Sequence, residues 1–250
     1  MKTEHILASM AVLAGAGVLS GCSTGTDDDN VGEIRFKEKM GMLVNLNKCI
    51  GCAACVMACK LENGTQQGVY WNNINFKEVE ENNTVKRRVQ PTGCNHCTNA
   101  PCIQVCPTGA SHFEEDGTVQ VDMEVCIGCH KCVIECPYKA RQFNYAELAD
   151  NPAYKMISDR FNEPNLVTPF EQAKSSKHKY LTAEKCTFCK ERRKNGEEPA
   201  CVETCPTKAR VFGNVQDSES VISKEIARLD AKPINSELGT KPSFYYAGKY

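Results

Sequence analysis

Cysteine is the residue of this sequence whose number and spacing best predict chemistry. The chain of 250 residues contains 17 cysteines, and all but Cys22 fall into four compact quartets. The first and third quartets share the spacing C-x2-C-x2-C-x3-C, the second is C-x2-C-x4-C-x3-C, and the fourth has a wider middle gap. The quartets are Cys49, Cys52, Cys55 and Cys59; Cys94, Cys97, Cys102 and Cys106; Cys126, Cys129, Cys132 and Cys136; and Cys186, Cys189, Cys201 and Cys205. Thiols at this density hold metal or form disulfides.

The spacing fits the shape of a cubane [4Fe–4S] cluster. Each of its four irons takes one thiolate, so a tight C-x2-C-x2-C loop wraps three corners and a more distant cysteine fills the fourth. Proline directly follows the last cysteine of three quartets, at Pro107, Pro137 and Pro206, and Lys60 takes that place in the first. A proline there suits a chain that leaves the helix or turn immediately after its last ligand.

Two other uses of the cysteines compete with this interpretation. A disulfide framework leaves an odd thiol in each tight loop and does not explain the repeated Cys-Pro pairs. Structural zinc favours two C-x2-C pairs separated by a longer loop, which only the fourth quartet partly resembles. Iron–sulfur ligation accounts for all four quartets.

Internal repeats indicate how the quartets are organised. Residues 44–52 align with residues 121–129, and residues 102–110 align with residues 201–209. The first and third quartets are therefore one type and the second and fourth another, which predicts a duplicated two-cluster unit.

The segment Pro91–Phe143 resembles a complete bacterial ferredoxin. Between its two quartets, residues 110–113 and 119–122 are expected to form short strands around Asp116-Gly117, a two-residue turn signal. The first and fourth quartets must then meet in space and build another module from the two ends of the chain. The predicted fold is α+β, with two bacterial-ferredoxin-like modules joined by long loops, the second module (module B) nested inside the first (module A).

This resemblance also implies which cysteines share a cluster. In two-cluster ferredoxins the cysteine before proline ligates the other cluster of the pair. The implied sets are set 1, Cys49, Cys52, Cys55 and Cys205; set 2, Cys94, Cys97, Cys102 and Cys136; set 3, Cys126, Cys129, Cys132 and Cys106; and set 4, Cys186, Cys189, Cys201 and Cys59.

The four-quartet pattern, with the blocks CNHC at 94–97 and CTFC at 186–189, resembles a known family over roughly residues 40–215. This is the four-cluster electron-transfer (beta) subunit of molybdopterin oxidoreductases of the DMSO reductase type. Its members serve polysulfide, thiosulfate, tetrathionate, arsenate and DMSO reductases and formate dehydrogenases. Some replace one ligand of the third quartet and hold a [3Fe–4S] centre; since Cys129 is present here, four [4Fe–4S] clusters are implied. The resemblance also implies a molybdopterin-containing catalytic subunit as partner beside module A, and a quinol-oxidising membrane subunit or cytochrome beside module B.

The residues themselves predict an electron-transfer subunit that is not an enzyme. With four thiolates on each cluster, no iron keeps an open position for a substrate, and no catalytic triad or phosphate loop stands beside the quartets. A formal net charge of −1 argues against binding of nucleic acid. Two alternatives remain open: a small subunit with structural clusters in a non-redox molybdopterin complex, and a free polyferredoxin carrier.

The first residues predict export and attachment to a membrane. The apolar run Ile6–Leu19 has the length of a signal-peptide core and is shorter than the roughly 20 residues of a spanning helix. It leads into Ser20-Gly21-Cys22, which resembles a bacterial lipobox, so cleavage before Cys22 and lipidation of Cys22 are expected. We therefore expect a lipid-anchored protein on the extracytoplasmic side of the cell envelope. No twin-arginine pair precedes the run, so we expect either export together with a partner that carries this signal or a leader that works unconventionally.

The predicted organisation follows from these assignments. It comprises a signal peptide at 1–21, a flexible tether at 22–39, the first half of module A at 40–90, module B at 91–145, an insertion loop at 146–180, the second half of module A at 181–215 and a C-terminal tail at 216–250. Within the tail, Val221, Ile222, Ile226 and Leu229 have helical spacing. The basic run Lys190–Lys194 is expected to be a solvated face or a contact with an acidic partner.

Overall fold

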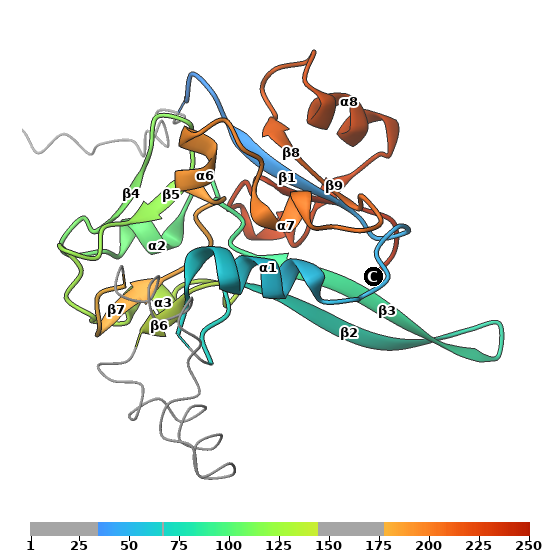
Figure 1. Ribbon diagram of the computed structural model, residues 1–250, viewed down its shortest axis with the longest axis horizontal. Helices are drawn as coiled ribbons and strands as arrows, with labels where there is room; N and C mark the ends of the chain where they lie inside the picture. The colour runs from blue at the N-terminus through green and yellow to red at the C-terminus, as the bar shows by residue number, and fades with distance from the viewer. Residues whose placement is uncertain (1–34, 67, 145–177) are drawn as a thin grey trace, which may run out of the picture. The chain divides into compact units, whose positions relative to one another are not determined.

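The computed structural model describes residues 35–66, 68–144 and 178–250, which form a mixed α/β structure (Figure 1). The strands are β1 (Met40–Asn45), β2 (Asn72–Glu81), β3 (Thr84–Gly93), β4 (Ser111–Phe113), β5 (Val119–Val121), β6 (Gln142–Asn144), β7 (Thr182–Glu184), β8 (Arg210–Asn214), β9 (Lys232–Pro233) and β10 (Phe244–Ala247). The helices are α1 (Ala54–Asn63), α2 (Pro101–Gln104), α3 (Lys131–Ile134), α6 (Lys190–Lys194), α7 (Ala200–Glu203) and α8 (Val221–Arg228), with a 3-10 helix η2 at Ser236–Leu238.

A four-stranded sheet in the order β8-β1-β10-β9 joins the two ends of the chain (Figure 1). Strand β1 is antiparallel to β8 and parallel to β10, with Val44 opposite both Arg210 and Tyr246. Its side chains alternate between two cores: Met42 packs with residues of α1 and α7, and Leu43 packs with Ile222 of α8. A strand that is buried on both faces is expected to be continuously apolar, as Met42-Leu43-Val44 is.

Three of the helices directly follow a cysteine loop that turns sharply. Ala53, His130 and Cys189 precede α1, α3 and α6, and all three have left-handed backbone angles, with φ of 61°, 62° and 51°. Ala53 and His130 occupy the same place, directly after the second cysteine of their quartets. The repeat seen in the sequence is therefore also a repeat of backbone geometry.

The hairpins differ in how well the sequence predicted them. The predicted strands at 110–113 and 119–122 are present as β4 and β5, but the turn is longer than two residues. The Glu114 N–H donates to the Thr118 carbonyl at 2.9 Å, so residues 115–117 form a three-residue loop with Gly117 at φ 69°. Hairpin β2–β3 was not predicted. Its two turn residues, Asn82 and Asn83, are both left-handed, as a type I′ turn requires.

The packing of the chain differs from the expected organisation at two places. The expected tether at 22–39 ends in packed residues: Phe36 contacts the Phe113 ring at 5.0 Å, and Lys39 donates from its buried Nζ to the carbonyls of His96 at 2.9 Å and Gly117 at 2.6 Å. The expected tail at 216–250 contributes β10 to the interior of the sheet, because its aromatic side chains complete the core against β1. The expected helix in this segment is present as α8.

Several sequence predictions lie outside the described residues. They are the signal peptide at 1–21, Cys22 and residues 146–177 of the insertion loop. In the part of the chain that is described, no helix has the length and apolar character to cross a membrane.

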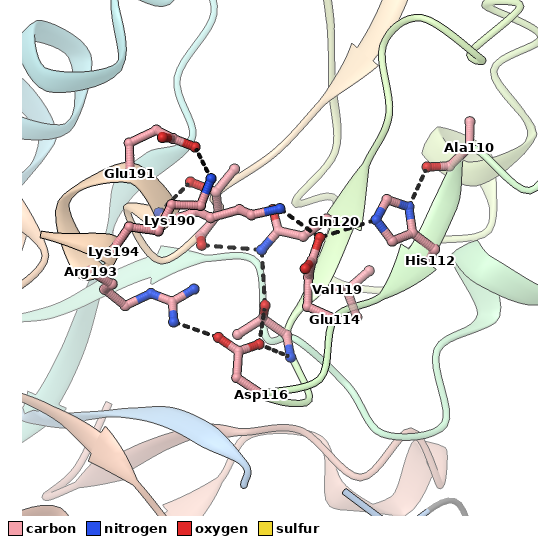
Figure 2. A network of polar contacts seen from close by, with 12 residues as sticks. Ala110, His112, Glu114, Asp116, Val119, Gln120, Lys190, Glu191, Arg193 and Lys194 are labelled. Carbon is pink, nitrogen blue, oxygen red and sulfur yellow. Dashed lines mark hydrogen bonds and ion pairs between the residues drawn. The ribbon is translucent and has the colours of Figure 1, made fainter. Parts of the chain in front are cut away.

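Ion pairs join α6 to the β4–β5 loop. Lys190 Nζ lies 2.6 Å from Glu114 Oε1, and Arg193 Nη1 lies 2.5 Å from Asp116 Oδ2. Figure 2 shows both pairs. Burial raises the pKa of Asp116, but hydrogen bonds from Thr118 and Arg193 outweigh it and hold the pKa below the ordinary value. The basic run at 190–194 is thus in part an internal contact of the chain and not simply a solvated face.

The packing of α8 predicts that residues 216–250 stabilise the whole fold. We expect Ile222→Ala to lower the free energy of unfolding by about 2–5 kcal/mol, because Ile222 is fully buried against β1 and β8. The neighbouring exposed residue is the control: Val221→Ala should cost less than about 0.5 kcal/mol. Anaerobic denaturant titrations of both variants measure the difference, and equal effects would contradict the integration of this segment.

Candidate metal centres

Three cavities are each lined by the four thiols of one predicted set. One cavity is lined by set 1, another by set 4 and the third by set 3. Each of these sets takes three cysteines from one quartet and one from another. The cavities have nearly the same empty volume, about 340, 340 and 350 Å³, which indicates three copies of one kind of site. Among the described residues, no group of three or more cysteine, histidine or acidic side chains converges closely enough to hold a single metal ion. The thiols surround a space instead of a point, as the ligands of a polynuclear cluster must.

Set 2 is brought together as well. Burial, together with the nearby thiols of Cys94, Cys102 and Cys136, raises the pKa of the Cys97 thiol to about 12. All sixteen quartet cysteines are free thiols, so the disulfide alternative has no support in this structure.

Short helices bring the quartets together in two pairs. Helix α1 carries Cys55 and Cys59 and packs against α7, which carries Cys201. Helix α2 carries Cys102 and packs against α3, which carries Cys132. The first quartet therefore meets the fourth, and the second meets the third.

Backbone amides point at the sulfurs in a repeated pattern. The N–H groups of His96 and Phe188 each donate to the thiol two residues earlier, Cys94 and Cys186, at 3.4 Å. The Ser111 N–H donates to Cys106 at 3.4 Å, and the Ala209 N–H donates to Cys205 at 3.3 Å. Although burial raises the pKa of Cys106 and Cys205, these hydrogen bonds lower it below the ordinary value. Such donors favour negative charge on sulfur and tune cluster potentials.

Several buried thiols need a cation nearby to ionise. Burial raises the pKa of Cys201 to about 11, and it also raises the pKa of Cys59 and Cys186. Four such thiols around one cavity become thiolates together only when positive charge offsets their burial and mutual repulsion. The donor set, the shared cavity and the amide hydrogen bonds all fit an iron–sulfur cluster, whose irons supply that charge.

Buried basic residues among the thiols were missed by the sequence analysis. Arg210 donates from Nη2 to Cys55 Sγ at 3.5 Å and from Nη1 to Cys201 Sγ at 3.6 Å. Arg141 lies among the thiols of sets 2 and 3, and Lys185 lies beside Cys94 and Cys186. A signal was present, because the segment C-P-x-K-A-R occurs at both 136–141 and 205–210.

Comparison with known proteins agrees with this geometry. Two family models, both described as 4Fe-4S dicluster domains, match the chain, one over residues 48–110 and the other over residues 85–163 and 153–215. Among the relatives, the arsenate respiratory reductase iron–sulfur subunit ArrB of Shewanella sp. is 36% identical over 223 residues, 83% of this chain and 95% of that protein. The B subunit of selenate reductase from Mesobacillus selenatarsenatis is 36% identical over 207 residues, 82% of this chain and 70% of that protein. The B subunit of polysulfide reductase from Wolinella succinogenes is 35% identical over 211 residues, 83% of this chain and 93% of that protein.

The protein belongs to the family of iron–sulfur B subunits of these reductases. It is an electron-transfer subunit and not a catalytic one. Two dicluster domains correspond to four [4Fe–4S] clusters, the number predicted from the sixteen cysteines. The mixed α/β structure likewise agrees with the coarse fold prediction.

A glycine in the third quartet tests how tightly the cluster loops are built. A Cβ on Gly128 would lie 2.2 Å from the Leu181 carbonyl oxygen, and φ there is +67°. We expect Gly128→Ala to lower the free energy of unfolding by about 3 kcal/mol or more and to reduce iron retention, because backbone strain and overpacking act together.

Gly109→Ala is the matched control for this prediction. Gly109 has nearly the same φ, +71°, but a Cβ there meets no atom within 4 Å. The equivalent positions after Cys136 and Cys205 already hold Lys139 and Lys208 with positive φ. Unfolding midpoints and iron content should therefore change much less in Gly109→Ala, and equal losses in the two variants would contradict the close packing at Gly128.

Proposed function

We propose that this protein holds four [4Fe–4S] clusters through sets 1–4, and relays electrons between a molybdopterin catalytic subunit and a quinone- or cytochrome-reactive partner. The observation that carries the proposal is that thiols from two quartets line each of three equal cavities. A bound cluster would supply a one-electron redox centre, whereas the chain supplies the ligands, the burial and the surrounding charge. In this proposal sets 1 and 4 form module A, and sets 2 and 3 form the nested module B.

The contacts between sets support one order of clusters, 1–4–2–3. Arg210 contacts Cys55 of set 1 and Cys201 of set 4, while Arg141 lies beside Cys102 of set 2 and Cys132 of set 3. The two modules adjoin where Cys186 of set 4 lies near Cys94 of set 2.

The junction between the modules contains two stacked aromatic rings. The rings of His96 and Phe188 stack there at 3.8 Å, and both side chains are fully buried. Each ring follows the first cysteine of its quartet by two residues, so the two sides of the junction are built alike. An unbroken row of closed redox centres is the arrangement that long-range electron transfer needs.

Exposure supports clusters 1 and 3 as the two ends of the row. Cys52 of set 1 and Cys129 of set 3 are exposed, and every cysteine of sets 2 and 4 is buried or half-buried. Beside these two thiols, Ile50 and Ile127 are each 66% exposed. Exposed apolar side chains beside a surface cluster suit a docked partner, because they exclude water from the contact. By the family resemblance, the catalytic subunit would dock beside cluster 1 and the other redox partner beside cluster 3.

The proposal is tested by metal content and by a set of cysteine variants. Anaerobically purified protein should contain about sixteen iron and sixteen sulfide per chain, because each cubane holds four of each. Cys49→Ser and Cys205→Ser should perturb the same cluster signal in electron paramagnetic resonance, and Cys59→Ser and Cys201→Ser should perturb a second one. If Cys205→Ser and Cys201→Ser instead affect one common signal, the exchange of cysteines between quartets is wrong.

The same samples separate electron transfer from the two alternative functions. Clusters that stay unreduced at all accessible potentials would favour a purely structural role. A chain that purifies without any catalytic subunit from its native membranes would favour a free carrier. Reducible clusters in a complex with a molybdopterin subunit are the expected result.

We also propose that the mature protein begins at Cys22 and is held to the extracytoplasmic face of a membrane by acyl chains on that residue. The support is the apolar run followed by Ser20-Gly21-Cys22, together with a polar stretch at 23–30 in the sequence.

Mass spectrometry of the native protein tests this anchor. We expect a peptide that begins at acylated Cys22, and we expect Cys22→Ala to remove the protein from the lipidated membrane fraction. Ser23→Ala is the control and should remain anchored. An uncleaved leader with an unmodified Cys22 on cytoplasmic protein would contradict the proposal.

A further inference from the structure

Each half of the relay contains one arginine that is buried at its centre. Arg141 and Arg210 are 3% and 5% exposed, and no carboxylate in the described ranges forms an ion pair with either. A guanidinium stays charged at any physiological pH. A buried charge without a carboxylate is strongly destabilising unless other negative groups surround it. The groups that surround these two side chains therefore indicate what compensates their positive charge.

Arg210 spans two thiol sets. Its Nη2 donates to Cys55 Sγ of set 1 at 3.5 Å and to Asn72 Oδ1 at 3.1 Å, and its Nη1 donates to Cys201 Sγ of set 4 at 3.6 Å. It also lines both cavities. One planar cation thus faces two cluster positions at once.

Arg141 has the same relation to sets 2 and 3. Its Nη1 donates to Ser111 Oγ at 2.8 Å, and the thiols of Cys102 and Cys132 lie beside it. Its Nε and Nη2 are buried and have no hydrogen-bond partner among the described residues. Buried donors without acceptors are costly, so these two nitrogens fit an anionic guest in the space between the thiols.

The two arginines occupy equivalent positions of the repeat. Each is the fifth residue after a fourth cysteine, within Cys136–Arg141 and Cys205–Arg210, and each faces the third cysteine of both quartets in its module. After Cys106 the fifth residue is Ser111, which accepts the hydrogen bond from Arg141. In module A the neutral side chain of Asn72 has the corresponding role. Each module therefore holds one guanidinium and one neutral polar partner at its centre.

We propose that Arg141 and Arg210 are shared positive charges, each of which raises the reduction potentials of both clusters in its module. Cluster potentials respond to nearby charge and to hydrogen bonds on sulfur. A cation that lies between two clusters favours the added electron on either one, and burial strengthens its effect. The proposal rests on the proposed function, because it requires clusters in sets 1–4.

Potentiometric titrations followed by electron paramagnetic resonance test the proposal on the whole protein with its partners. Arg141→Gln should make reduction of clusters 2 and 3 at least tenfold less favourable, which is a fall in reduction potential of at least about 59 mV for a one-electron couple. The potentials of clusters 1 and 4 should not change. Arg210→Gln should instead lower the potentials of clusters 1 and 4 and leave those of clusters 2 and 3 unchanged. Arg141→Lys and Arg210→Lys keep the charge and should restore most of the shift. Arg87→Gln, on the exposed hairpin, should change nothing.

The outcomes of these titrations distinguish failure of the arginine proposal from failure of the proposed electron-transfer function. Full cluster content with unshifted potentials in both glutamine variants would overturn the role of the arginines and leave the relay intact. A shift in one cluster of a module but not the other would overturn the sharing. If a glutamine variant loses its clusters, the lysine variant decides: normal loading and potentials support the charge, and loss of clusters shows a packing role instead. Wild-type protein without reducible clusters would overturn the proposed function itself.

Discussion

Negative charge on buried sulfur is the constraint on which the rest of this structure depends. Thiolates avoid low-dielectric surroundings, and several of these thiols have pKa values raised by burial. The fold responds with backbone N–H groups aimed at sulfur and with basic side chains placed between thiol sets. Helices α1 and α3 serve the same end, because each begins at a cysteine loop and carries further cysteines into the interior.

Positive charge recurs at each step of the proposed row of clusters. Arg210 lies between sets 1 and 4, Lys185 between sets 4 and 2, and Arg141 between sets 2 and 3. Lys185 is fully buried and donates to the carbonyls of Val119 and Cys186. The ion pairs between α6 and the β4–β5 loop then fix the two halves on the outside of the same junction. Charged side chains thus act both at the proposed cluster sites and in the contacts that hold the two modules together.

Most of the site could be predicted from the sequence, because ligand spacing is a local property. A cubane requires thiols at short intervals, so the quartets and their repeat were visible without any structure. The role of the two arginines could not be predicted, because the role of a residue five positions after a ligand depends on which other quartet it contacts. Ser111 and Arg141 look unrelated in the sequence, yet they face each other across the centre of one module.

The sequence predicted one local hairpin, β4–β5, but missed another, β2–β3, and it did not predict where distant segments pair. Hairpin β4–β5 followed from its turn residues. Strand β10 did not, because Phe244, Tyr245 and Tyr246 look like an isolated aromatic cluster until β1 is known to lie beside them. The packing of Lys39 under Gly117 depends in the same way on a loop that lies 78 residues further along the chain.

The parallel pairing of β1 with β10 bears on how the protein matures. Strand β1 pairs with both β8 and β10, and its pairing with β10 must wait until residues 244–247 have been synthesised. Cys205 must likewise have been made before set 1 is complete. In the proposed sites, the first quartet therefore waits for the fourth before set 1 has all four of its ligands. A cluster delivered before residue 205 has been made would meet only three of the four thiols of set 1.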